Sequence, residues 1–281
     1  MARFKLLLAL MFGMMLTGCG GEDAPEISPE LSPAPLPIET QAPLTELRYE
    51  GALLPLAELC DALGYELDII GENFADIEGR ELEYFPEDGF VRFNGRYIYA
   101  PEGWEQSEDG IMLEAEAAAR ILGLGLKAEG DCHIVDISRS ALLPGGDGYY
   151  ELHYDMDMLY WLPQIIHAEA LGQPMAGLIG VGNVVMNRME SEKFPDSITN
   201  VIFDREHVIQ FEPVENGSIK AQPDERAKIA AYLCLEGYNT VGDSLFFVNP
   251  AYGSHWFDTE LELSYVIGEH NFYRYKDAEN A

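Results

Sequence analysis

Basic residues are scarce in this chain of 281 residues, which has 17 Lys and Arg against 49 Asp and Glu and a formal net charge of −32. Nucleic-acid binding needs a basic surface that neutralises phosphates, so the composition excludes a general nucleic-acid binder. It also excludes steering of anionic polymers by the whole surface. An anionic substrate would have to meet a local patch. The best candidates are Arg188, Lys193, Arg205, Lys220, Arg226 and Lys228.

Cysteine is also scarce, and the spacings typical of metal sites are missing. The four cysteines are Cys19, Cys60, Cys132 and Cys234, with no CxxC pair among them. This argues against a disulfide framework and a structural zinc site, although Cys60 and Cys132 could pair. His167-x-Glu169 lacks the HExxH spacing that places two zinc ligands on one helix face. We therefore expect neither a metal nor a cofactor.

Hydrophobic runs long enough to span a bilayer are missing too, because the apolar stretch 6–16 is too short. It follows Arg3 and Lys5 and leads into Leu16-Thr17-Gly18-Cys19, which resembles a bacterial lipobox. We expect a signal peptide at 1–18, lipidation of Cys19, and an extracytoplasmic lipoprotein on the outer face of the cytoplasmic membrane. The alternative is a soluble secreted protein with an incidental Cys19. The Pro- and Glu-rich segment 19–47 predicts an extended tether.

A degenerate repeat marks the N-terminal half. Residues 53–67 and 111–126 each pass from a short apolar segment into an amphipathic helical pattern, which ends at Gly64 or Gly123. Alternating segments at 90–93 and 96–99 predict strands. This pattern over 48–140 resembles the small α+β domain named after the N-terminal domain of copper amine oxidases. The resemblance implies a wall-binding or spacing module, and nothing in it indicates copper.

A Gly-rich break predicts a linker at 141–154, and the following part, 155–276, is predominantly helical in pattern. Asp157 is the expected N-cap of a helix at 158–170 that Pro163 interrupts or kinks. Gly177, Gly180 and Gly182 leave room for close backbone approach or for a glycan. The remaining expected elements are helices at 175–191, 197–203 and 223–237, a β segment at 244–248 and a closing segment at 265–275.

One carboxylate stands out in this half. Glu169 ends an apolar helical stretch and faces a bend formed by Gly172 and Pro174. Partial desolvation at such a place raises the pKa of a carboxyl group and prepares it to donate a proton near neutrality. That chemistry suits cleavage of a glycosidic bond. A structural, salt-bridged glutamate is the plain alternative.

Several segments, in the same order, resemble the cell wall hydrolase family typified by the spore cortex-lytic enzymes SleB and CwlJ. The segments are 166–170, 180–188, 193–195, 201–202, 210–211, 245–250 and 267–274. The resemblance implies a mainly α, lysozyme-like domain that cleaves peptidoglycan, so the expected fold class is α+β with this catalytic domain following the repeated β/α domain.

The resemblance places the catalytic glutamate at Glu169, with His167 where the family usually has tyrosine and Gln173 where it often has a second acid. A packed histidine is the simpler interpretation of His167. The candidate substrate contacts that the resemblance implies are Asn187, Arg188, Gln210, Asn249, Trp256 and His270.

A single carboxylate favours a lytic transglycosylase, because that reaction needs neither water nor a second carboxylate. Hydrolysis with Glu190, Glu192 or Asp196 as the base stays open. Two other hypotheses are a non-catalytic wall-binding lipoprotein that retains the fold, and an N-acetylmuramoyl-L-alanine amidase. The expected partners are peptidoglycan glycan strands and, through Cys19, the membrane. The sequence leaves open whether the substrate is spore cortex or vegetative wall.

Overall fold

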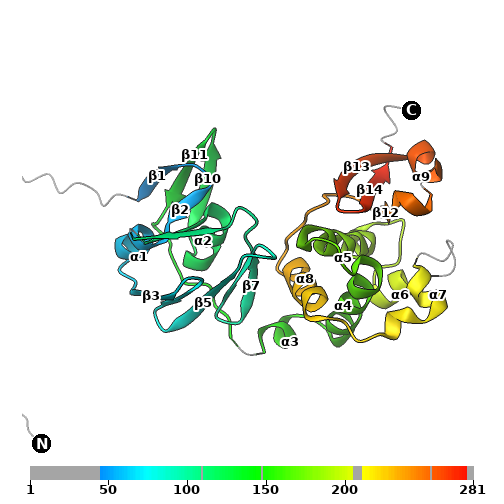
Figure 1. Cartoon of the computed structure of the whole chain (residues 1–281), viewed down its shortest axis with the longest axis horizontal. Coiled ribbons are helices and arrows are strands. Elements are labelled where there is room, and N and C mark those ends of the chain that lie inside the picture. Colours follow the sequence, from blue (N-terminus) through cyan, green and yellow to red (C-terminus); the bar gives the residue numbers. More distant parts are fainter. Residues whose placement is uncertain (1–44, 109, 147, 205–210, 254, 277–281) are drawn as a thin grey trace, which may run out of the picture. The chain divides into compact units, whose positions relative to one another are not determined.

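A computed structural model describes residues 45–108, 110–146, 148–204, 211–253 and 255–276 (Figure 1). All of these residues belong to one structural unit. The predicted signal peptide, the lipidation site Cys19, nearly all of the tether and the candidate Gln210 lie outside the described residues. None of the described helices is both long enough and apolar enough to cross a membrane.

The N-terminal half is built from antiparallel strands with two short helices. Its sheets have the orders β1-β11-β10, β2-β9-β8 and β3-β4-β5-β6-β7. The helices are α1 (Leu56–Leu63) and α2 (Ala115–Leu122). The strands are β1 (Glu46–Glu50), β2 (Leu53–Pro55), β3 (Leu67–Gly71), β4 (Phe74–Ile77), β5 (Arg80–Phe85), β6 (Phe90–Phe93), β7 (Arg96–Tyr99), β8 (Trp104–Ser107), β9 (Gly110–Glu114), β10 (Gly125–Glu129) and β11 (Cys132–Asp136).

The two copies of the repeat pair with each other. Strand β2 of the first copy lies antiparallel to β9 of the second, with Leu54 opposite Leu113. Gly64 and Gly123 take left-handed conformations directly after α1 and α2, which confirms them as the ends of these helices. A Cβ at Gly123 would lie 2.1 Å from the carbonyl oxygen of Ala141, so glycine is required there for space as well as conformation.

The C-terminal half combines helices with one small sheet, in agreement with the expected α+β class. Its helices are α3 (Tyr149–His153), α4 (Met156–Ala170), α5 (Met175–Glu190), α6 (Ile198–Ile202), α7 (Glu212–Asn216), α8 (Glu225–Leu235) and α9 (His255–Glu260), with 3₁₀ turns η1 (Ser218–Lys220) and η2 (Pro250–Tyr252). The strands β12 (Phe246–Val248), β14 (His270–Tyr275) and β13 (Leu261–Ile267) form an antiparallel sheet in that order.

Helix α4 begins earlier than the sequence pattern indicates. Asp155, not Asp157, is its N-cap, because the Asp155 carboxylate accepts a hydrogen bond from the backbone N–H of Met158 at 2.6 Å. Asp157 instead accepts a hydrogen bond from Thr199. Pro163 lies in the helix interior and not in its first turn. The expected extents of α5, α6 and α8 agree with the structure to within about two residues, which is the usual precision of helix ends.

Glycines in α5 are used for close packing against side chains. A Cβ at Gly182 would lie 2.6 Å from Sγ of Cys234 on α8 and 2.9 Å from Cδ1 of Ile166 on α4. A Cβ at Gly180 would lie 2.8 Å from Cγ1 of Val241. Side chains therefore fill the space at these two positions, and the alternative that it holds a glycan is wrong for them.

The predicted linker at 141–154 is packed and partly helical. Leu142 and Leu143 lie against the core of the N-terminal half, and α3 carries the buried Tyr150 into the core of the C-terminal half. Tyr150 stacks on Tyr232 of α8 with ring centroids 4.2 Å apart. A sequence rich in glycine predicted a flexible break, but the apolar residues on either side of the glycines anchor it.

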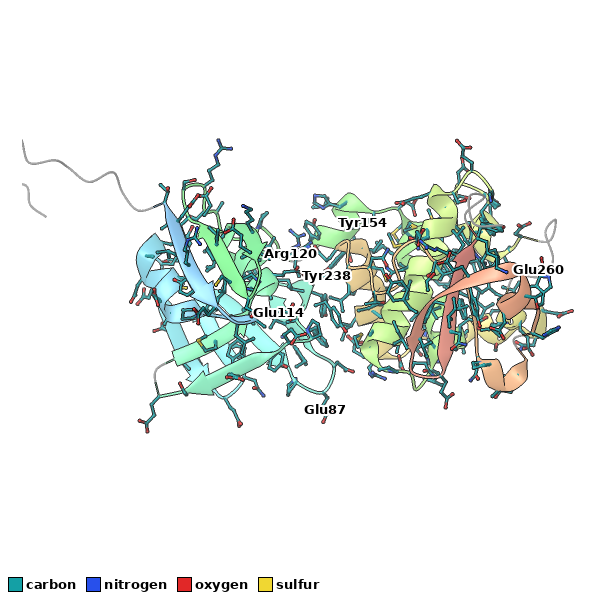
Figure 2. The ribbon with its side chains drawn as sticks, turned by 90° about the horizontal axis from the view of Figure 1, so that it is seen from above. Glu87, Glu114, Arg120, Tyr154, Tyr238 and Glu260 are labelled. Atoms are coloured by element: carbon teal, nitrogen blue, oxygen red, sulfur yellow. The ribbon has the colours of Figure 1, made fainter. Side chains whose placement is uncertain are left out.

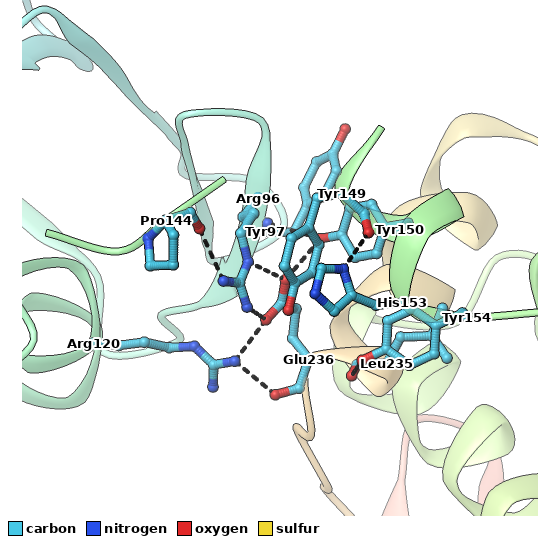
Figure 3. Close-up of polar contacts among 10 residues, drawn as sticks. All are labelled: Arg96, Tyr97, Arg120, Pro144, Tyr149, Tyr150, His153, Tyr154, Leu235 and Glu236. Carbon is cyan, nitrogen blue, oxygen red and sulfur yellow. Dashed lines mark hydrogen bonds and ion pairs between the residues drawn. The ribbon is translucent and has the colours of Figure 1, made fainter. Parts of the chain in front are cut away.

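A buried carboxylate joins the two halves within this unit (Figure 3). Glu236, which follows α8, accepts hydrogen bonds from Nε of Arg96 at 2.8 Å, from Nη2 of Arg120 at 2.6 Å and from the hydroxyl of Tyr150 at 3.1 Å. The Glu236 side chain is 1% exposed and that of Arg96 is 7% exposed. The guanidinium carbon of Arg120 also lies 5.0 Å from the ring centroid of Tyr238. Both residues are labelled in Figure 2. Arg96, Arg120 and Glu236 therefore form ion pairs but lose much of their contact with water.

Replacing Glu236 by alanine should strongly destabilise the protein. The change leaves Arg96 buried without its anion, which costs about 3–5 kcal/mol in the free energy of unfolding. Glu225→Ala is the matched control, because Glu225 begins the helix that Glu236 follows and forms an exposed pair with Lys228. This change should cost at most about 1 kcal/mol. Urea unfolding of both variants measures the difference. Equal effects would contradict a structural role for the buried cluster.

Candidate active site

Glu169 lies in the last turn of α4, a helix that packs against α5 and α8. The helix stops because Gly172 takes a positive φ of 84°, and the backbone N–H of Gln173 closes the turn on the Ala170 carbonyl at 3.0 Å. On the preceding turn, Ile165 and Ile166 are fully buried. The apolar face of α4 therefore carries Glu169 to the edge of the core, as the sequence pattern predicts.

The environment of Glu169 favours its neutral form. Burial raises the pKa of Glu169 from 4.5 to about 7, the negative charge of Glu212 adds to the increase, and Arg188 opposes it. Across the ranges that the structure describes, the Glu169 carboxyl group makes no hydrogen bond or salt bridge that would hold it ionised. A large fraction of Glu169 is therefore protonated at neutral pH and able to donate a proton.

Arg188 of α5 is the cation that acts on Glu169. It is 3% exposed, and its Nε donates a hydrogen bond to the carbonyl oxygen of Leu245 at 2.7 Å. Its guanidinium carbon lies 5.0 Å from the ring centroids of Phe194 and Phe211 and 5.5 Å from that of Phe246. Burial lowers the pKa of Arg188 to about 10, which still leaves it charged.

One nitrogen of this guanidinium group has no hydrogen-bond partner among the described residues. The buried Nη1 of Arg188 makes no hydrogen bond within the described part of the chain. A buried, charged donor without an acceptor is costly, and this is the reason that such groups usually meet a carboxylate, a water molecule or a ligand. Arg188 therefore combines a fixed position with spare hydrogen-bonding capacity.

Aromatic rings continue from Arg188 to His270. Phe211, directly before α7, lies 6.3 Å from Phe247 of β12 between ring centroids, and Phe247 lies 5.4 Å from His270 of β14. His270 is buried, and burial lowers the pKa of its imidazole. Its Nδ1 has no hydrogen-bond partner among the residues described. The small sheet thus contributes one aromatic side of this region. The sequence predicted its strand β12, within 244–248, but not the strands β13 and β14.

Two predicted substrate contacts form hydrogen bonds to loops. Asn187 donates its amide protons to the carbonyl oxygens of Gly242 at 2.8 Å and Ser244 at 2.9 Å. Asn249 accepts a hydrogen bond from the N–H of Ala251 at 3.0 Å and donates one to Glu269 at 3.2 Å. These bonds correspond to the loop-stabilising role that is common for polar side chains around a cleft.

The other predicted substrate contacts differ in their exposure to solvent. Trp256 on α9 is 56% exposed, so its indole face is open to a ligand, and it contacts Phe257 edge to face. Arg188 and His270 are buried. Gln210 lies outside the described residues, directly before Phe211.

His167 and Gln173 have clear structural contacts. Nδ1 of His167 accepts a hydrogen bond from the N–H of Asp224, the N-cap of α8, at 3.3 Å. The buried Gln173 accepts one from the N–H of Glu269 at 2.9 Å, so its side chain holds the turn between β13 and β14. Each residue that departs from the expected family pattern therefore stabilises the fold beside Glu169.

The carboxylate that most raises the pKa of Glu169 was not predicted from the sequence. Glu212, the first residue of α7, is exposed and raises the pKa of Glu169 by its charge. The sequence candidates for a second carboxylate, Glu190, Glu192 and Asp196, are not among the groups that perturb Glu169. The signal available in the sequence was the position of Glu212 directly after the Gln210-Phe211 segment.

Three of the six residues of the proposed basic patch are ion-paired or buried. Arg226 forms an ion pair with Asp88 at 2.7 Å, Lys228 forms one with Glu225 at 3.3 Å, and Arg188 is buried. Lys193 and Lys220 are exposed, and Arg205 lies outside the described residues. Cys60, Cys132 and Cys234 are free thiols, so Cys60 and Cys132 do not pair. In the described ranges no three His, Cys, Asp or Glu side chains gather in a way that could hold a metal ion.

The raised pKa of Glu169 predicts a pH-dependent effect of Glu169→Gln on stability. Glu169 holds up to one proton more in the folded protein than in the unfolded chain between about pH 4.5 and pH 7, so its contribution to stability falls as the pH rises through that range. The neutral glutamine avoids this loss. The variant should gain stability over wild type as the pH increases and should reach a plateau above pH 7.

Urea unfolding at pH 4, 6 and 8 measures this gain, with Glu215→Gln on α7 as the matched control. Glu215 is exposed and does not perturb Glu169, so its replacement should give no such trend. A stability difference for Glu169→Gln that stays constant with pH would contradict the buried, proton-binding state of Glu169.

Comparison with known proteins gives consistent matches for the C-terminal part. Residues 172–273 match the family model described as Cell Wall Hydrolase, a range that begins three residues after Glu169. A spore cortex-lytic enzyme of Oceanobacillus iheyensis is 30% identical over 120 residues, which cover 42% of this chain and 42% of that protein. The spore cortex-lytic enzyme of Bacillus subtilis is 31% identical over 111 residues, or 40% of this chain and 33% of that protein.

A solved structure of the catalytic domain of the germination-specific lytic transglycosylase SleB from Bacillus anthracis is 27% identical, with a TM-score of 0.40. The match covers 43% of this chain and 98% of the chain in that structure. The chain spans less than half the length of the curated relatives it matches. By sequence, the C-terminal part of the chain is similar to the Cell Wall Hydrolase family and, within it, to spore cortex-lytic enzymes.

Proposed function

We propose that this protein is an enzyme that cleaves the glycan strands of peptidoglycan and that Glu169 is its general acid. The observation that carries the proposal is the burial of Glu169, which raises its pKa to about 7 so that a large fraction of it carries a proton at neutral pH. The similarity of residues 172–273 to the Cell Wall Hydrolase family and to spore cortex-lytic enzymes supports peptidoglycan as the substrate.

Glu169 suffices for lytic transglycosylation. It first donates its proton to the bridging oxygen between muramic acid and glucosamine, so the bond between that oxygen and C1 breaks. The resulting carboxylate then accepts the proton of the C6 hydroxyl of muramic acid as this oxygen bonds to C1. The product is a 1,6-anhydro ring, the second glycan fragment leaves with the proton on its oxygen, and Glu169 returns to its acid form.

Glu212 supports hydrolysis as a second candidate. Its carboxylate acts on the pKa of Glu169, so a second acidic group lies near the general acid. In an inverting or retaining glycosidase such a group activates water or attacks C1. A single carboxylate at the site would favour transglycosylation, whereas Glu212 provides the second acidic group that hydrolysis uses. The chemical form of the product ends distinguishes the two routes.

The remaining alternatives make separate predictions. A non-catalytic wall-binding lipoprotein should release no soluble product from the wall. An N-acetylmuramoyl-L-alanine amidase should release new amino groups and, if it depends on a metal, should be sensitive to chelators. The raised pKa of the Glu169 carboxyl group supports glycan cleavage over both alternatives, because neither requires a protonated glutamate.

We further propose an extracytoplasmic location with a lipid anchor at Cys19. The support is the lipobox-like sequence Leu16-Thr17-Gly18-Cys19 and the proline-rich segment after it. The sheet-rich N-terminal half would then act as a copper amine oxidase N-terminal-like module that binds or approaches the wall. Its contact with α8 through Glu236 supports a module that holds the catalytic part in a fixed orientation.

Product analysis tests the proposed reaction. Purified full chain is incubated with peptidoglycan and with spore cortex, and the soluble fragments are identified by mass spectrometry. We expect anhydromuropeptides from wild type and a loss of at least about a hundredfold in Glu169→Gln, typical for loss of a general acid. Reducing ends in place of anhydro ends would identify hydrolysis. Unchanged cleavage by Glu169→Gln would refute the role of Glu169.

The pH dependence of cleavage should report the charge of Glu212. Because the acid form of Glu169 is required, the rate should fall as the pH rises above about 7. Glu212→Gln removes a charge that raises the pKa of Glu169, so this decline should move to lower pH. The shift should shrink at high salt, since Glu212 is exposed.

Glu215→Gln on the same helix is the control and should leave the pH profile in place. Initial rates of release of soluble fragments at constant ionic strength give the profiles. A decline that stays at the same pH in Glu212→Gln would show that Glu212 does not influence the essential acid.

A further inference from the structure

A hollow lies at the C-terminal end of α5 and has a volume of about 380 Å³. Helix α5 contributes Asn187 and Glu190, the turn after it contributes Lys193, and the small sheet contributes Tyr275. The turn is fixed, because the N–H of Ser191 bonds to the Arg188 carbonyl at 3.1 Å and the N–H of Phe194 bonds to the Ser191 carbonyl at 3.0 Å. The other lining residues are Ser191, Asp243, Leu245 and Arg274.

Two of the four charged groups around this hollow neutralise each other. Arg274 forms an ion pair with Asp243 at 3.4 Å and a closer one with Glu262 at 3.0 Å. The side chains that keep their charge available are Lys193 and Glu190. Among the residues described, neither forms an ion pair, and both are exposed.

Lys193 is nevertheless held in place. Its ammonium nitrogen lies 3.7 Å from the ring centroid of Tyr275, a distance at which the ring attracts the cation. The hollow therefore presents one fixed cation and one carboxylate, on residues three apart, beside the partly exposed ring of Tyr275. An occupant that pairs with both needs a carboxylate and an ammonium group a short distance apart, with an aliphatic part for the ring.

The hollow adjoins the region of Glu169 through Arg188. Leu245, which lines the hollow, accepts the hydrogen bond from Nε of Arg188, and Asn187 precedes Arg188 on α5. A ligand in the hollow would thus lie next to the side chain that acts on Glu169. Glu169 itself does not line the hollow, so binding there is separable from proton transfer.

We propose that this hollow binds a free α-amino-acid group of peptidoglycan, in which one carbon carries both an ammonium and a carboxylate. Such a group lies at the end of an amino-acid side chain in the peptide part of peptidoglycan. The carboxylate pairs with Lys193, the ammonium pairs with Glu190, and the methylene chain packs on Tyr275. This inference rests on the proposed function for its substrate. Diaminopimelate in a peptide offers such a head, whereas lysine in the same place offers the ammonium alone.

Titration calorimetry of the purified full chain with a synthetic tripeptide tests the inference. The probe is L-alanyl-γ-D-glutamyl-meso-diaminopimelate, and the matched ligand has L-lysine in the third position. We expect the lysine peptide, and separately the variants Lys193→Met and Glu190→Gln, to bind about tenfold more weakly, as loss of one charge-assisted contact implies. Lys228→Met, on an exposed face of α8 outside the hollow, should bind like wild type.

The peptide contains no glycosidic bond, so its binding does not depend on Glu169 or on cleavage. Equal affinity for the two peptides, unchanged affinity in both hollow variants, or no binding of the first peptide at millimolar concentration would each overturn the inference. Retained cleavage without peptide binding would refute only this inference. Peptide binding without cleavage of glycan by the wild type would refute only the proposed reaction.

Discussion

The close packing of α4 and α8 against α5 is the constraint on which the candidate site depends. Gly182 lets Ile166 of α4 and Cys234 of α8 approach the backbone of α5, since a Cβ there would lie 2.9 Å and 2.6 Å from their side chains. Ile166 is one turn before Glu169. Any outward displacement of α4 would hydrate Glu169 and return its pKa toward the ordinary value. A larger residue at position 182 would force such a displacement or a strained rotamer.

Glu169 and Arg188 illustrate a balance between burial and attraction. A nearby cation lowers the pKa of a carboxyl group, and a strong ion pair would hold Glu169 ionised. Burial nevertheless has the larger effect, because the pKa of Glu169 remains raised to about 7. Arg188 is instead surrounded by three rings and the Leu245 carbonyl. Glu169 can therefore hold a proton near neutral pH. After it donates that proton, the charge of Arg188 stabilises the carboxylate that remains.

The elements that depend on local chemistry could be predicted from the sequence. Gly64 and Gly123 end their helices, the strands at 90–93 and 96–99 form, and Glu169 lies at the end of an apolar helix. Contacts between distant residues could not be predicted. Arg96 and Glu236 are 140 positions apart, and no periodicity links them. Glu212 influences the pKa of Glu169 only because α7 lies against α4. The side-chain amide of Asn187 donates a hydrogen bond to the distant loop residue Gly242, which the pattern of α5 does not specify.

The most direct test of the account is the titration of the Glu169 carboxyl group itself. Carbon-13 NMR of the protein labelled at glutamate side-chain carboxyls, with Glu169→Gln to assign the signal, gives the midpoint without any assumption about substrate. The account predicts a midpoint near 7, because burial disfavours the charged form. A midpoint near the ordinary value of 4.5 would mean that Glu169 is ionised at neutral pH, and it would contradict the role of Glu169 as a general acid.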